Sequence, residues 1–408
     1  MSSYKLGAVG PSTFDKLSMN ILLLSPFLQS YGWGKYNMSL IFTSILGLIC
    51  VFSNLPKNPI PKFVTIYLGY WFISNLISST SILDIFHFGI IRTLIIYYLF
   101  FACFKLEYFI TIYRKIVCFF VGYFFIQEFF QRIIGVKLPS LFSFLPICVS
   151  DDADGLLTNI AEGQRNSSFF SEPAILVQFI LPILAFELLC TKIIPWKRVI
   201  FLVLALLFLQ SGNALLGLLI LGVMFAYKLL FIEKIKYKFL IIVSSIFFLV
   251  PVAAIYLNSS LGQSVLERGK TIKSDSVEKT GYVSSGFVRI YRGYFVFAEY
   301  APIYKFIGND HPNYQTQSAS NSEVRYLFND GELYFNSIQH VLIYTGYIGT
   351  FIFMIMLYKL WKDTTYGGKT ILLIIFGLSF ISFMFFTPLM AFYLLIPHSL
   401  KKGHSLQF

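Results

Sequence analysis

Apolar stretches of helical length follow one another along nearly the whole chain of 408 residues, and a single long polar stretch interrupts them. A membrane-spanning helix needs about 20 mainly apolar residues, and somewhat fewer when it is tilted or paired. The pattern predicts twelve spans, at residues 17–32, 38–53, 63–81, 88–104, 115–134, 172–190, 198–210, 213–232, 238–257, 335–358, 370–386 and 388–399. The polar stretch, Asn258 to Tyr334, separates the ninth span from the tenth and is 77 residues long.

Two of the span boundaries depend on short polar signals. The run 198–232 is too long for one helix, and the turn Gln210–Asn213 divides it into two helices that meet below the outer surface. Such a dip is tolerated only where the backbone faces protein or water. Near the C-terminus, Thr387-Pro388 is either a kink within one helix or a turn between two.

The composition agrees with this pattern. The chain is 56% hydrophobic and only 13% charged, whereas a soluble globular protein has about 25% charged residues. The net charge of +12 comes from Lys and Arg residues dispersed over short loops rather than gathered into the basic patch of a nucleic-acid-binding protein. We therefore predict an all-α polytopic membrane protein of about 12 transmembrane helices, with residues 1–408 as a single transmembrane domain.

The distribution of positive charge predicts the orientation. With the N-terminus in the cytoplasm, the inner segments carry 19 Lys and Arg residues, and the short outer segments carry 4: Lys35, Arg132, Lys137 and Arg165. This asymmetry predicts cytoplasmic termini and two extracytoplasmic loops, 135–171 and 258–334. The larger loop has 8 basic and 8 acidic residues, with apolar residues at helical spacing, so we predict a folded, partly helical lobe.

The first candidate for chemistry is the segment Phe287–Phe295 of the large loop. As a helix it places Arg289 and Arg292 one turn apart on the same face, with aromatic residues around them. Two guanidinium groups at that spacing suit a pyrophosphate. An interfacial helix whose arginines contact lipid head groups or Glu299 explains the pattern equally well.

The second candidate is the segment Arg165–Pro173, which ends the first outer loop and opens a span. Ser171 and Glu172 are suited to cap and stabilise the start of that helix. Alternatively, Glu172 beside Arg165 is suited to act as a general base on a sugar hydroxyl. Both interpretations remain open at this point.

Arg92 is the third candidate, because it lies inside the fourth span, four residues from its outer end. An arginine within a span is a functional candidate, and snorkelling of its head group to the interface is the alternative.

The sequence predicts no metal site and no cofactor. The acidic run that begins at Asp151 fails the calcium-loop template, because the twelfth position is Ala161. His311 and His340 have no partner at ligand spacing, and we find no glycine-rich phosphate loop.

Four segments together resemble the family of O-antigen polymerases and ligases of the bacterial cell envelope. They are Arg165–Pro173, similar to the family's Arg…Gly-x-Phe-x-Glu-Pro stretch; Leu209–Gly217, with Asn213 where an Arg is usual; Gly308–Asp310, without the second Gly of the family's Gly-x-Gly; and Asn336…Gly346-Tyr-Ile-Gly349. The resemblance covers about half of the chain. The ligases usually carry a His directly before the Asn, and Phe335 stands there in this chain. The departure favours a polymerase.

The resemblance implies a processive, metal-independent glycosyltransferase of the bacterial inner membrane. It would polymerise undecaprenyl-pyrophosphate-linked repeat units at the periplasmic face, for O-antigen, and hence lipopolysaccharide, or for capsule. Its partners would be the carrier-linked glycan, membrane lipid, and a chain-length regulator and flippase of the same pathway, with no nucleic acid. On this interpretation Glu172, Arg165, Arg289 and Arg292 are catalytic, and the substrate-binding residues are Arg92, Asn309 and Asn336.

Three other functions stay open. An O-antigen ligase shares the motifs, a flippase or another transporter of lipid-linked oligosaccharides can also have twelve spans, and a non-catalytic scaffold needs none of the chemistry. Transporters often show internal repeats, and the sequence shows none.

Overall fold

A computed structural model describes residues 10–33, 36–53, 57–78, 89–140, 145–146, 166–232, 285–322 and 335–401. Helices make up 77% of this part of the chain, which confirms the predicted helical class. The strands among the described residues are β1 (Gly32–Trp33) and β2 (Tyr36–Asn37), an antiparallel pair with Gly32 opposite Asn37.

Helices overlap eleven of the twelve predicted spans, and the twelfth, 238–257, lies outside the described residues. The helices are α1 (Thr13–Leu28), α2 (Met38–Phe52), α3 (Lys62–Ser78), α5 (Gly89–Cys103), α6 (Leu106–Phe129) with η1 (Phe130–Ile134), α8 (Pro173–Leu189), α9 (Trp196–Phe208), α10 (Gly212–Tyr227) with η2 (Lys228–Ile232), α17 (Ser337–Asp363), α18 (Tyr366–Leu378) and α19 (Pro388–Ser399). Three are long and apolar enough to cross a membrane: Leu106–Ile134, Gly212–Ile232 and Ser337–Asp363.

The two boundaries that depend on polar signals are both turns. The run 198–232 divides between Phe208 and Gly212, as predicted. The C-terminal run is two helices, because Pro388 opens α19 and the Thr387 side chain accepts a hydrogen bond from the Met390 backbone. The predicted span 370–386 is too long: α18 ends at Leu378, and residues 379–387 form a loop.

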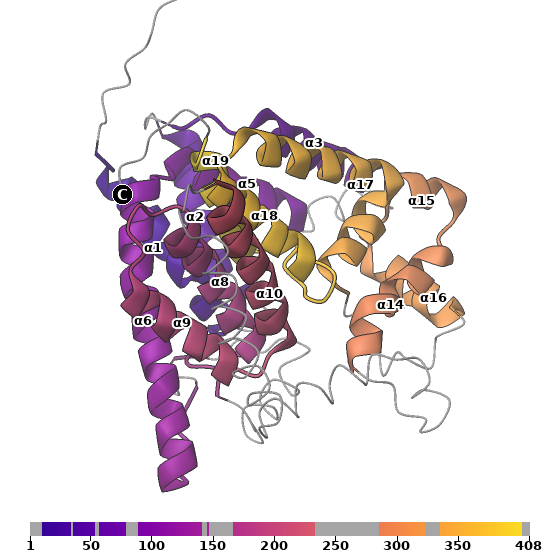
Figure 1. The fold of residues 1–408 in the computed structure, drawn as a ribbon. Coiled ribbons are helices and arrows are strands. Elements are labelled where there is room, and N and C mark those ends of the chain that lie inside the picture. The colour runs from indigo at the N-terminus through magenta and orange to yellow at the C-terminus, as the bar shows by residue number, and fades with distance from the viewer. Residues whose placement is uncertain are drawn as a thin grey trace, which may run out of the picture.

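The helix α8 forms the centre of the main bundle. All its side chains from Leu176 to Leu189 are buried, and the helices α6, α9, α10, α18 and α19 contact it (Figure 1). A helix that is apolar on every side can be stable only when other helices surround it. The bundle core is therefore built around this single segment.

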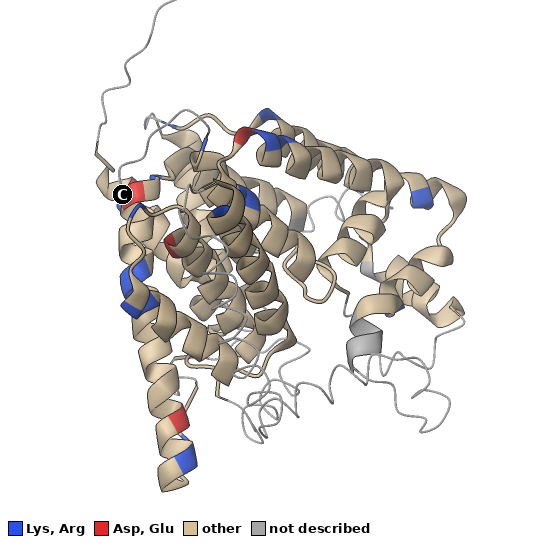
Figure 2. Cartoon of the chain, in the orientation of Figure 1, with Lys and Arg blue, Asp and Glu red and all other residues tan. Residues whose placement is uncertain are grey.

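One ionised group interrupts this core. Glu187 of α8 is completely buried, and its Oε1 accepts hydrogen bonds from Arg114 of α6 and Arg198 of α9, each at 2.6 Å. The two arginines come from neighbouring helices and are partly exposed. This ion network ties three helices together at one end of the bundle. Figure 2 shows few charged positions over the bundle, and most Lys and Arg lie in its upper half in that view.

The described part of the large loop is a helical lobe, as the sequence predicts. It contains α14 (Ser285–Ala298), α15 (Pro302–Ile307) and α16 (Pro312–Asn321). A separate apolar core joins it to α17, through buried Val296, Phe297, Tyr300, Phe335 and Ile343. In Figure 1 the lobe lies beside α17, on the far side of the bundle from α6.

Candidate functional site

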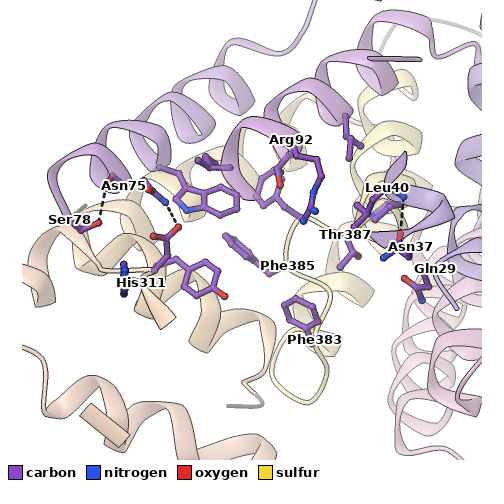
Figure 3. A pocket seen from close by; sticks show the side chains of 18 of the residues that line it. Gln29, Asn37, Leu40, Asn75, Ser78, Arg92, His311, Phe383, Phe385 and Thr387 are labelled. Atoms are coloured by element: carbon purple, nitrogen blue, oxygen red, sulfur yellow. Dashed lines mark hydrogen bonds between the residues drawn. The ribbon is translucent and has the colours of Figure 1, made fainter. Parts of the chain in front are cut away.

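A cavity of about 740 Å³ lies where α3, α5, the lobe and the loop 379–387 meet. Its polar lining includes Gln29, Asn37, Asn75, Arg92, Asp310 and His311. Its aromatic lining includes Trp71, Tyr344, Phe383, Phe385 and Phe386. Figure 3 shows Asn75 and His311 at one end, Gln29 and Asn37 at the other, and Arg92 and Phe385 between them. Ligand sites in proteins typically combine such an apolar wall with a few polar groups.

Two glycines bring Asp310 to this cavity. Gly308 has φ +84°, and Gly346 has φ +64° at a kink within α17. A Cβ on Gly308 would lie 2.3 Å from the Tyr344 carbonyl oxygen, and one on Gly346 would lie 2.4 Å from the Phe306 carbonyl oxygen. Only glycine allows both the backbone conformation and the close approach. The segment that ends at Asp310 therefore packs directly against the kink.

The helix α3 holds the same segment from the other side. Ser74 donates to the Ile307 carbonyl, and the Asn75 amide donates to the Asp310 carboxylate. Asp310 is partly buried and lies in the lobe between α15 and α16. Burial raises the pKa of its carboxyl from 3.8 to about 6, although the polar groups of Trp71 and Asn75 favour the charged form. A carboxyl with this pKa can accept a proton near neutral pH.

Asn309 supports the neighbours of Asp310. Its side chain is buried, and its Oδ1 accepts a hydrogen bond from the His311 backbone at 2.9 Å. Its backbone N–H donates to the Ile343 carbonyl, and its carbonyl accepts from the Tyr300 hydroxyl. The structure therefore places Asn309, predicted to bind substrate, beside the cavity as a residue that orients Asp310 and His311.

Arg92 lines the cavity from the first turn of α5. It is partly buried, and Figure 3 shows its side chain extending along the hollow toward Thr387. The structure thus brings Arg92, one of the predicted substrate-binding residues, into a common cavity with Asp310.

Three of the lining rings, Phe383, Phe385 and Phe386, belong to the loop 379–387, and we call them the aromatic wall. The start of α17 holds this loop through hydrogen bonds. Asn336 caps α17 through the Gln339 backbone, and its amide donates to the Phe380 carbonyl. Ser337 donates to the Ser382 carbonyl, and the Ser382 hydroxyl donates to Asn213. Asn336 is buried and does not line the cavity. It positions the rings of the loop instead, and Asn213 holds the same loop by accepting the hydrogen bond from Ser382.

The two arginines of α14 are only partly described. The predicted helix 287–295 is confirmed, and the side chain of Arg289 lies outside the described part. Arg292 is buried, with its guanidinium carbon 6.0 Å from the Phe335 ring centroid. The rings continue from Phe335 to His340 at 5.6 Å and on to Phe383 at 4.4 Å. Arg292 therefore lies behind the aromatic wall and is not part of the cavity lining.

The structure separates Glu172 from the cavity. Glu172 is exposed, occupies the N-cap position of α8, and makes no capping hydrogen bond with its side chain. The prediction that Ser171 caps this helix is wrong by one residue, since the helix begins at Pro173 and Glu172 precedes it. Arg165 lies outside the described residues.

Sequence reasoning missed Asp310, Trp71 and Asn75 as lining residues. Asp310 had a signal, because it directly follows the Gly308 turn that the family resemblance singled out. Trp71 and Asn75 had none, since a single aromatic or amide side chain in an apolar span is ordinary. Within the described ranges no group of three or more His, Cys, Asp or Glu residues is arranged to hold a metal ion.

Comparison with protein-family models, with curated proteins and with solved structures found no match to this chain.

Proposed function

We propose that this protein is a membrane glycosyltransferase that polymerises undecaprenyl-pyrophosphate-linked repeat units at the periplasmic face of the bacterial inner membrane. The observation that carries the proposal is the cavity that holds Arg92 and Asp310 between aromatic rings. Sugars have apolar faces that pack on aromatic rings and hydroxyls that need polar partners. A lipid-linked donor also needs a site within reach of the bilayer, and α3 and α5 are apolar helices.

The proposed reaction uses Asp310 as the general base. An acceptor hydroxyl of the new repeat unit attacks the anomeric carbon of the growing chain and transfers its proton to the Asp310 carboxylate. The bond between that carbon and the carrier pyrophosphate breaks, and the pyrophosphate leaves with the electron pair. Arg92 stabilises the charge that develops on the leaving group. The donor is already activated, so the reaction needs no nucleotide or metal ion.

The residues first expected to be catalytic take other places in this proposal. Arg292 supports the aromatic wall through Phe335, and Arg289 and Arg165 remain candidates for binding pyrophosphate. Glu172 would act as the base only on an acceptor hydroxyl that lies outside the cavity. Asn309 and Asn336 act as positioning residues for Asp310 and for the loop 379–387.

The proposal includes twelve spans, cytoplasmic termini and periplasmic loops at 135–171 and 258–334. Its support is the count of 19 inner against 4 outer Lys and Arg residues. We expect alkaline phosphatase to be active when fused after Gly155 or Ser276, and inactive when fused after Lys236 or Lys362. An inactive fusion at Ser276 would reverse the orientation and place the lobe in the cytoplasm.

The test of the function is the set of lipid-linked products. In a strain that lacks the protein, a polymerase predicts single repeat units on lipid A, a ligase predicts polymer stranded on the carrier, and a flippase predicts repeat units retained on the cytoplasmic side. In vitro, purified wild-type protein should make polymer from lipid-linked repeat units alone. Arg92→Ala should lower this rate roughly 100-fold, and Arg92→Lys should restore part of it, because Lys lacks the bidentate fork.

A further inference from the structure

A second hollow, of about 320 Å³, lies between α2, α3 and α5. Its lining is almost entirely apolar and includes Val64, Leu68, Gly69, Leu94, Ile95 and Phe101. We refer to this hollow as the apolar groove. The proposed reaction gives it no role.

The apolar groove and the cavity are both lined by α3 and α5, and on α3 they lie along the same face. On α3, Val64 and Leu68 line the groove, and Trp71 and Asn75 line the cavity. Their spacing of four, three and four residues puts all four on one face of the helix. The groove takes the N-terminal half of α3, and the cavity takes its C-terminal half.

The helix α5 lines both hollows from different sides. Arg92 and Ile96 line the cavity, whereas Leu94 and Phe101, about half a turn around the helix from Arg92, line the groove, which continues farther along the chain. At a rise of 1.5 Å per residue, the groove side of α5 extends about 14 Å beyond Arg92.

One aromatic contact lies between the two hollows. The Tyr97 ring lines the groove, and its centroid lies 4.7 Å from that of Phe386, which lines the cavity. A ligand that occupied both hollows would have its polar part beside Arg92 and its apolar part against α3 and α5.

We propose that the apolar groove binds the first isoprene units of a polyprenyl carrier whose pyrophosphate lies at Arg92. The inference rests on the proposed function, which supplies a ligand with a long polyprenyl tail, a dianionic or trianionic head and a sugar beyond it. The order of the surfaces matches the order of these parts: apolar groove, then guanidinium, then the cavity with Asp310. A phospholipid would place only a small head group in a cavity of about 740 Å³.

Gly69 makes the groove testable. It lines the groove, and a Cβ built on it meets no atom within 4 Å. Gly69→Phe should therefore place a ring in the groove without displacing the protein. Gly122 of α6 is a matched control, since it is also helical and partly buried, has nothing within 4 Å of its Cβ, and does not line the groove.

The experiment uses undecaprenyl pyrophosphate with a diazirine on its first isoprene units, added to the full-length protein in nanodiscs. We expect wild type and Gly122→Phe to crosslink within α3 and α5, and Gly69→Phe to lose at least nine-tenths of that label. With a sugar-bearing donor, Gly69→Phe should raise KM roughly tenfold and leave kcat nearly unchanged, because burial of the tail is lost and the reacting groups are not. A donor with a two-isoprene tail should show a smaller change in KM.

Three outcomes would overturn the inference: crosslinks of the wild type that map to other helices, equal labelling of Gly69→Phe and wild type, or equal displacement of the probe by a diacyl phosphatidylglycerol. The wild-type crosslinking needs no variant, so a misfolded Gly69→Phe protein leaves the test intact. If the carrier crosslinks in the groove but no polymer forms from any donor, the groove assignment stands and the polymerase proposal fails.

Discussion

Glu187 and Asp310 are both acidic groups withdrawn from water, and the protein treats them in opposite ways. Glu187 is completely buried and accepts hydrogen bonds from two arginines at 2.6 Å. Asp310 opens onto a cavity, and the side chains of Asn75 and Trp71 that favour its carboxylate carry no charge. Glu187 is therefore needed for stability, because removing one partner of a buried ion pair leaves the other charges uncompensated. Asp310 has a raised pKa, which keeps its carboxyl ready for proton transfer.

The comparison separates an acid that holds helices together from an acid that is suited to chemistry. Glu187 joins α6, α8 and α9, and no cavity lining includes it among the described residues. Asp310 costs stability in its charged form, because burial opposes the charge. Proteins retain such unfavourable groups mainly at functional sites.

The largest difference between a variant of Asp310 and a variant of Glu187 is expected in activity. Asp310→Asn keeps the size and the hydrogen-bonding oxygen of the side chain but cannot accept a proton. The rate of polymer formation should fall roughly 100-fold or more. Glu187→Gln is the matched control, and its specific activity per folded molecule should stay within a few fold of wild type. The measurement is initial rate in vitro at equal amounts of folded protein, and equal losses in the two variants would erase the distinction.

The next difference is in thermal stability, which Glu187→Gln should lower and Asp310→Asn should leave unchanged or raise. Glu187→Gln leaves two arginines facing each other, and breaking a buried pair costs about 3–5 kcal/mol, less here because both arginines are partly exposed. Its Tm in detergent should fall by several degrees. Asp310→Asn removes a charge that burial opposes, so its Tm at pH 7.5 should equal or exceed that of wild type. A lower Tm for Asp310→Asn would show that its charge stabilises the fold.

The Asp310 carboxyl should also make both the stability and the activity of the protein depend on pH. Its folded pKa of about 6 exceeds its unfolded value of 3.8, so the folded state holds the proton more tightly. The resulting stabilisation is complete below about pH 4 and is lost as the pH rises through about 6. Wild-type Tm should therefore decrease across this window relative to Asp310→Asn. Activity should change the other way, falling about tenfold per pH unit below pH 6 as the base becomes protonated.

The sequence predicted the helices well, because their signal is local. Apolar runs located eleven described helices, and the polar turn at Gln210–Asn213 located the boundary between α9 and α10. The error at 370–386 arose because residues 379–387 are as apolar as the helix before them, and their rings face a cavity instead of a helix interface. Hydropathy cannot distinguish a phenylalanine that lines a cavity from one that packs between helices.

The site was harder to predict, because its residues meet only in the folded chain. Asn309 and Asn336 were found as motif residues, but their hydrogen bonds show that they orient neighbouring segments. Asp310 becomes a candidate only when Gly308 packs against the kink at Gly346. Glu172 had the stronger sequence signal, a carboxylate at the start of a span, and the structure leaves it outside the cavity.

The smallest effect is therefore expected at Glu172, which lies at the opposite end of α8 from Glu187. Its side chain is exposed, makes no capping hydrogen bond and stands at the N-terminus of α8, the positive end of the helix dipole. Glu172→Gln should cost a few tenths to about 1 kcal/mol of stability and leave turnover near the wild-type value. The assay is polymer formation from purified lipid-linked repeat units at matched protein levels. A loss of roughly 100-fold would instead make Glu172 the base, and Asp310 would then be a carboxyl that shapes the cavity without taking the proton.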